Sequence, residues 1–147
     1  MLKYYIKKMF GSFASAHVQS PATGKCGKIH GHNWIVEIDF GCQELDENGF
    51  VINFNNLKEI EQFLNKMLDH TLMVSEEDPR LPIFKKMYEC DLADVIYLEN
   101  GASAENLSLI IFNEASKILH DKTSGRVWVE KVIVHEDEKD SSFIKSC

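Results

Sequence analysis

The stretch from His30 to Phe40, HGHNWIVEIDF, alternates polar and apolar residues with a period of two, which is the pattern of a β-strand. One face carries the even-numbered side chains, namely His30, His32, Trp34, Val36, Ile38 and Phe40. Residues i and i+2 of a strand point to the same side, about 6.5–7 Å apart. The two histidines therefore project together, on the apolar side of the predicted strand.

Composition and charge restrict the class of protein. The chain has 147 residues, of which 44% are hydrophobic and 27% charged, so we expect one globular domain spanning residues 1–147. The formal net charge is −7, and Arg80 and Arg126 are the only arginines. This balance argues against a general nucleic-acid binder, whose affinity depends on clustered basic residues. A small anionic substrate needs only a local positive pocket and is compatible with this net charge.

The cysteines and the N-terminal segment bear on the compartment. Four cysteines occur without close pairing, at positions 26, 42, 90 and 147, which favours free thiols in a reducing cytosol. The segment MLKYYIKKMF lacks the long apolar core and the cleavage site of a signal peptide. No window approaches the roughly 20 apolar residues of a membrane span. We therefore expect a soluble cytoplasmic protein with no membrane or nucleic-acid partner.

The other patterns outline an α+β fold. Strands are predicted over 2–9 and 127–134, with short apolar runs at 50–54 and 95–98. Apolar residues recur with helical spacing over 57–68, and again over 107–119 after a plausible N-cap at Ser103. The irregular segment 75–94 lies between these helices and includes a possible short helix around 83–90. This order predicts an antiparallel β-sheet with two helices covering one face.

A catalytic zinc ion characteristically has three protein ligands and one open position. His17, in FASAHVQ, is the best third candidate after His30 and His32, because it follows the first predicted strand. The spacing alone fits a pair of hydrogen-bonded structural histidines equally well. Their apolar face favours a metal, since an unpaired buried polar group costs on the order of 1–3 kcal/mol. His120 and His135 have ordinary structural interpretations.

Five motifs in order resemble one enzyme family. They are FxxxH ending at His17, CGKIHGHNW at 26–34, LDHTLM at 68–73, SAENL at 103–107 and VIVHED at 132–137. Together they resemble the 6-pyruvoyltetrahydropterin synthase and 6-carboxytetrahydropterin synthase family, and they span nearly the whole chain. One departure is Ala102-Ser103, where the family usually has proline and threonine before the glutamate. The segment 75–101 is also longer than in compact members.

The resemblance implies a metal site and a set of catalytic residues. His17, His30 and His32 would bind Zn²⁺ and leave its fourth position to the hydroxyls of the substrate. Cys26 would lie outside the metal shell and act as the base, because a thiolate can take the proton that zinc makes more acidic. Asp69 and His70 would complete the proton relay, although Asp69 could instead reach the cysteine or a backbone group of another subunit.

The resemblance also implies how the substrate is bound. Glu136 matches the glutamate that anchors the pterin ring, and a carboxylate can accept two N–H groups from such an edge. Glu105 matches a second motif glutamate near the pterin pocket. Both residues also have ordinary structural interpretations. Glu136 lies in an acidic run that could be a solvated tail, and Glu105 suits the first turn of a helix, where the helix dipole favours a negative charge.

Members of this family start from 7,8-dihydroneopterin triphosphate and release triphosphate. The three-residue spacing between Cys26 and His30 resembles that of the bacterial 6-carboxytetrahydropterin synthases of queuosine biosynthesis. These lyases also release acetaldehyde. The pyruvoyl-forming branch and a non-catalytic zinc-binding protein are the alternatives. The implied fold is the tunnelling fold, in which three subunits close a barrel and two trimers stack into a homohexamer, with active sites between subunits.

Overall fold

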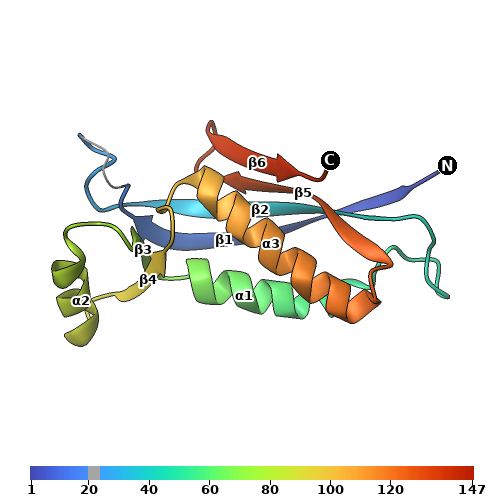
Figure 1. Cartoon of the computed structure of the whole chain (residues 1–147), viewed down its shortest axis with the longest axis horizontal. Coiled ribbons are helices and arrows are strands. Elements are labelled where there is room, and N and C mark those ends of the chain that lie inside the picture. The colour runs from blue at the N-terminus through green and yellow to red at the C-terminus, as the bar shows by residue number, and fades with distance from the viewer. Residues whose placement is uncertain (20–23) are drawn as a thin grey trace.

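The protein is described by a computed structural model that covers residues 1–19 and 24–147. Six strands form one curled sheet in the order β4-β3-β1-β2-β5-β6, and helices α1 and α3 lie across one face of it (Figure 1). The elements are β1 (Tyr4–His17), β2 (His30–Cys42), η1 (Phe54–Leu57), α1 (Lys58–Leu68), β3 (Thr71–Ser75), α2 (Leu81–Glu89), β4 (Asp94–Leu98), α3 (Ala104–Thr123), β5 (Val127–His135) and β6 (Ser141–Lys145). No helix in the described ranges has the length and apolar character to span a membrane.

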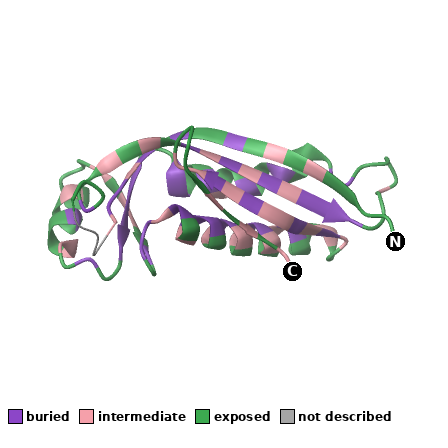
Figure 2. Ribbon diagram, turned by 90° about the horizontal axis from the view of Figure 1, so that it is seen from above, coloured by how far each residue is buried: buried purple, intermediate pink, exposed green. Residues whose placement is uncertain are grey.

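The main core lies between the sheet and the helices α1 and α3. Buried and more exposed residues alternate along the strands (Figure 2), as expected for a sheet with one covered face. Trp34, Val36 and Ile38 of β2 are fully buried there against Leu64 of α1 and Ile111 of α3. The apolar face predicted from HGHNWIVEIDF is therefore the central layer of the fold.

The segment between α1 and α3 extends the sheet. Strand β3 pairs in parallel with the end of β1, and β4 pairs in parallel with β3. Helix α2 covers this end of the sheet over a second apolar cluster of Val18, Leu72, Val74 and Phe84. The long insertion noted in the sequence is thus a packed unit beside the C-terminal end of β1.

A β-bulge changes the face that β1 presents to the core. Gly11 pairs with Ile35 and Phe13 with Trp34, so that Ser12 is the extra residue of β1. The residues packed toward the core are even-numbered before the bulge, such as Phe10, and odd-numbered after it, such as His17. Without this extra residue the His17 side chain would point to the opposite face of the sheet.

A second bulge has the same effect on β5. Phe40 pairs with Val129 and Asp39 with Lys131, which leaves Glu130 as the extra residue. Val129 is buried before this point, and Val132 and Val134 are buried after it. Glu136 continues the phase of these last two valines, so its side chain follows the covered face of the sheet.

The predicted class is confirmed, with additions. Strands β1, β2, β5 and β6 pair in antiparallel fashion, and β3 and β4 add a parallel edge. The short helix predicted around 83–90 is α2. The apolar run at 50–54 forms no strand: Asn53 Oδ1 accepts a hydrogen bond from the Asn55 amide at 2.9 Å and so caps the turn η1. Strands β3 and β6 were not predicted, and β1 continues beyond Met9 to His17.

Candidate metal centre

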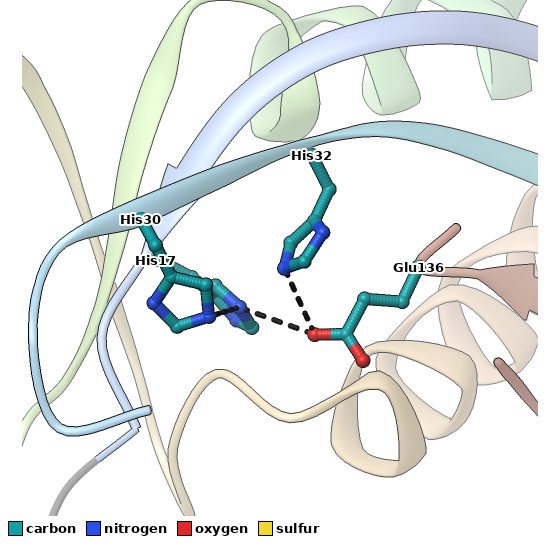
Figure 3. A group of neighbouring side chains, drawn as sticks. All are labelled: His17, His30, His32 and Glu136. Atoms are coloured by element: carbon teal, nitrogen blue, oxygen red, sulfur yellow. Dashed lines mark hydrogen bonds and ion pairs between the residues drawn. The ribbon is translucent and has the colours of Figure 1, made fainter. Parts of the chain in front are cut away.

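Strand pairing brings three histidines together. His17 lies directly opposite His30 in the β1–β2 register, and His32 lies two residues further along β2. The Nε2 atoms of His17 and His30 are 3.0 Å apart. With the carboxylate of Glu136, one ligand atom from each of these residues lies within 4.8 Å of all the others (Figure 3). The three predicted ligands and one predicted substrate-binding residue therefore form one cluster.

Backbone carbonyls fix the orientation of two of the rings. His17 Nδ1 lies 2.6 Å from the carbonyl oxygen of Ala102, and His30 Nδ1 lies 2.8 Å from that of Lys28. A carbonyl only accepts hydrogen bonds, so each Nδ1 carries a proton and donates it. In the neutral rings the two Nε2 atoms then carry lone pairs, which face each other with no proton between them. A cation placed among them would remove this repulsion.

Burial keeps His17 neutral. His17 is fully buried, and burial, with smaller contributions from His30 and His32, lowers its pKa from 6.5 to about 4; the hydrogen bond to Ala102 acts in the opposite direction. The ring of the buried Trp34 lies beneath, its centroid 5.0 Å from that of His17 and 5.2 Å from that of His32. The His17 imidazole is thus a lone-pair donor at neutral pH, which is the form that binds metals.

His32 has an unsatisfied nitrogen on the same side. Among the described residues its buried Nε2 has no hydrogen-bond partner, and the Glu136 carboxylate lies 3.2 Å away without hydrogen-bond alignment. The same Glu136 oxygen, Oε1, lies 3.2 Å from His17 Nε2. A tetrahedral ion with bonds of about 2.0–2.1 Å holds its ligands roughly 3.3 Å apart. The orphaned nitrogen of His32, the facing lone pairs and the 3.0 Å separation of the His17 and His30 Nε2 atoms fit a zinc ion.

Cys26 lies in the loop that precedes β2, outside this cluster. Its thiol is free and the residue is exposed, and the cysteines 42, 90 and 147 are free as well. The Cys26 carbonyl accepts a hydrogen bond from the Gln19 amide at 3.0 Å. The loop therefore has a defined backbone connection to the end of β1.

Asp69 and His70 lie side by side after helix α1. Asp69 Oδ1 is 2.9 Å from His70 Nδ1, and the side chains are 46% and 80% exposed. The His70 backbone is left-handed, with φ of 57°, a conformation that residues other than glycine adopt rarely. None of the hydrogen bonds or ion pairs among the described residues joins this pair to Cys26. The relay of Cys26 with Asp69 and His70 stays a prediction.

Glu105 and Glu136 border a common hollow. It has a volume of about 370 Å³, and its lining includes Gln19 and Ser142. Glu105 lies in the first turn of α3, whose N-cap Ser103 accepts a hydrogen bond from the Asn106 amide at 3.2 Å. His32 and Glu136 also line a second hollow of about 470 Å³. Glu136 thus belongs to the cluster and lines both hollows.

The closeness of Glu136 to the histidines was not predicted. From the sequence, Glu136 was predicted to bind the substrate and was not placed beside the metal ligands. The signal was hidden because the bulge in β5 changes the phase of the strand just before its end. The supporting carbonyls of Lys28 and Ala102 carry no side-chain signal at all, since any residue supplies a backbone oxygen. His135, given a structural role, lies 3.0 Å from Glu37.

Comparison with known sequences identifies relatives. A family profile described as 6-pyruvoyl tetrahydropterin synthase matches residues 5–146. The 6-carboxy-5,6,7,8-tetrahydropterin synthase of Aquifex aeolicus is 30% identical over 114 residues, covering 76% of this chain and 70% of the relative. That of Rickettsia bellii is 32% identical over 91 residues, covering 61% and 64%. The chain thus spans just under two thirds of the length of the Rickettsia bellii and Rickettsia felis relatives.

Solved structures share the fold. An uncharacterized protein from Wolinella succinogenes superposes with a TM-score of 0.84 at 18% sequence identity, covering 99% of both chains. The 6-pyruvoyl tetrahydropterin synthase of Caenorhabditis elegans superposes with a TM-score of 0.68 at 19% identity, covering 100% of this chain and 98% of the other. These matches confirm the predicted tunnelling fold.

Proposed function

Because the chain belongs to the 6-pyruvoyl tetrahydropterin synthase family, we propose that it is a zinc-dependent 6-carboxy-5,6,7,8-tetrahydropterin synthase. Its substrate is 7,8-dihydroneopterin triphosphate, and its products are 6-carboxytetrahydropterin, acetaldehyde and triphosphate. The names of the Aquifex and Rickettsia relatives support the carboxy-forming reaction over the pyruvoyl-forming one. The three-residue spacing between Cys26 and His30 supports the same choice. The unpaired cysteines suit a cytoplasmic enzyme of queuosine or deazapurine synthesis.

The observation that carries this proposal is the convergence of three Nε2 atoms whose opposite ring nitrogens, in His17 and His30, are already used by carbonyls. Such outer hydrogen bonds are typical of metal-binding histidines, since they fix the tautomer and the ring orientation. His17, His30 and His32 would hold the ion. Zinc bound there supplies Lewis acidity, which polarises a substrate hydroxyl and makes the neighbouring C–H more acidic.

The remaining side chains move protons and bind the ring. Cys26 is the base that removes a proton from the substrate side chain, a task for which its free and exposed thiol is suited. Asp69 holds His70 in one tautomer through the 2.9 Å contact, so that the Nε2 atom of His70 is free to exchange protons. Glu136 accepts N–H groups of the pterin, with Glu105 across the shared hollow.

The proton relay is completed between subunits. The Cys26 thiol and the Asp69–His70 pair are exposed and meet when copies of the chain assemble. Open sheet edges support this assembly. Among the described residues β3 pairs with β1 at Ala16 and His17, at the end of β1, so the earlier part of β1 has an open edge on that side. Strand β6 is an edge strand of the described sheet. Exposed apolar side chains lie on these two strands, namely Tyr5 and Met9 on β1 and Phe143 on β6. The unit is a barrel of three chains, stacked in pairs as a homohexamer.

The test is to incubate the purified zinc-loaded protein with 7,8-dihydroneopterin triphosphate and to identify the products by mass spectrometry. Formation of a 6-carboxy pterin with acetaldehyde is the expected result. A 6-pyruvoyl product would assign the protein to the other branch of the family. Stoichiometric zinc without turnover would indicate a non-catalytic zinc-binding protein instead.

A further inference from the structure

The loop that carries Cys26 is held from a distant part of the sequence. The Lys28 amide donates to the Lys25 carbonyl at 3.1 Å, which closes a turn around Cys26 and Gly27. Gly27 is buried, although the residues on both sides of it are exposed. The guanidinium group of Arg80 contacts Gly27, since its Nη1 donates to the Gly27 carbonyl at 2.6 Å.

Arg80 is itself fixed by a buried carboxylate. Asp78 is 2% exposed, and its two oxygens accept from Nε and Nη2 of Arg80 at 2.9 Å and 2.8 Å. The Arg80 amide also donates to Asp78 Oδ1 at 2.8 Å, so the turn before α2 orients both side chains. The guanidinium lies over the ring of the buried Phe84, 5.8 Å from its centroid. One rigid guanidinium group thus donates hydrogen bonds from Nε, Nη1 and Nη2 at the same time.

We propose that Arg80 is the positioning residue for Cys26. By holding the Gly27 carbonyl, it sets where the thiol points, and the segment 75–101 thereby controls the base of the reaction. This inference rests on the proposed function, in which Cys26 removes a proton from the substrate. Misplacing a reacting group by about 1 Å is enough to reduce a rate on the order of 100-fold. Arg80 acts through the loop backbone and needs no contact with the substrate.

The geometry requires an arginine. A planar guanidinium engages both Asp78 oxygens side by side and still points another N–H at Gly27, whereas a lysine ammonium is a single point charge. If charge alone mattered, Arg80→Lys would retain function. The chain offers a matched control in Arg126, which also donates to two backbone carbonyls, those of Glu44 and Val51, both at 2.8 Å. Neither carbonyl belongs to the Cys26 loop.

The experiment compares Arg80→Gln, Arg80→Lys and Arg126→Gln with the unaltered full-length protein. For both Arg80 variants we expect a kcat 10- to 100-fold lower, a KM within about threefold and an unchanged zinc content. Hydrogen exchange of the Gln19 and Lys28 amides, whose acceptors lie in the loop, should become faster. Arg126→Gln should leave kcat and the exchange of these two amides unchanged.

Each outcome decides the inference. Full activity in Arg80→Lys, or exchange that is unchanged in Arg80→Gln, would overturn it. Faster exchange without a loss of kcat would overturn it as well, because the loop position would then not matter. If the unaltered protein shows no turnover, the proposed function fails, and the exchange rates alone decide whether Arg80 orders the Cys26 loop.

Discussion

The imidazole cluster and the proton-relay residues are built in different ways. His17, His30 and His32 lie at the ends of two long paired strands, with a buried tryptophan beneath them and carbonyls behind two of the rings. Cys26, Asp69 and His70 lie in connections and are exposed. The imidazole cluster is therefore assembled within one chain, whereas the proposed proton relay depends on contacts between chains. The two halves should respond separately to mutation.

Removing a metal ligand should have the largest effect. We expect His32→Ala to lower zinc affinity by more than the 10- to 100-fold that loss of an outer hydrogen-bond partner costs, and to abolish turnover. Elemental analysis and chelator competition measure the affinity. The matched control is His135→Ala, which removes another strand histidine that contacts Glu37 and should keep the metal. Full zinc content in His32→Ala would refute the assignment of this ligand.

Removing the proposed base should lower the turnover rate without changing the zinc content. Cys26→Ala is expected to reduce kcat by about 10²–10⁴-fold, the usual contribution of a general base, with zinc content and melting temperature unchanged. The thiol is exposed, so its loss leaves no core cavity. Cys90→Ala, which alters another exposed cysteine, serves as the control. A fall in zinc content in Cys26→Ala would instead make Cys26 a structural ligand.

Acid should destabilise the metal-free protein through His17. Its pKa is about 4 when folded and 6.5 when unfolded, so the unfolded state binds more protons between these values. Stability is then fully present above pH 6.5 and falls by about 3 kcal/mol as the pH drops to 4. Urea titrations of chelator-treated protein measure this loss. In His17→Gln, which has no titrating group at this position, the loss between pH 6.5 and 4 should be much smaller.

Sequence periodicity was sufficient to predict the buried face of the regular strands and helices. The inward face of β2, the helix over 57–68 and the helix capped by Ser103 follow uninterrupted patterns, so their faces were predicted from spacing. The pair His30 and His32 followed from the same regularity. His17 came from its position after the first predicted strand and from the family resemblance. Strand β3 was missed because all five of its residues are buried, so it shows no alternation.

The other misses lie where strands are irregular. An extra residue shifts the phase of a strand by one, so a period-two pattern read across it assigns every later side chain to the wrong face. Extending the even-numbered face of residues 2–9 would have directed His17 away from His30. The same error in β5 would have directed Glu136 outward. The two bulges thus decide the cluster, and neither produces a sequence pattern of its own.

The bulge in β1 offers the smallest and most specific test. Gly11 has φ of +112°, and a Cβ there would lie 2.8 Å from the Trp34 carbonyl oxygen. We expect Gly11→Ala to lower the free energy of unfolding by about 1–2 kcal/mol and to weaken zinc binding, because the bulge that orients His17 must shift.

Gly49→Ala is the matched control for this change. Gly49 has φ of +80° and nothing within 4 Å of its added Cβ, so it bears the cost of a left-handed alanine without a clash, in a turn between β2 and η1. Chemical denaturation and chelator competition on both variants separate the two effects. If the bulge orients His17, both variants lose stability and only Gly11→Ala loses zinc affinity. Equal zinc affinity in the two would mean that the bulge keeps His17 in place without a glycine at position 11, and would contradict this prediction.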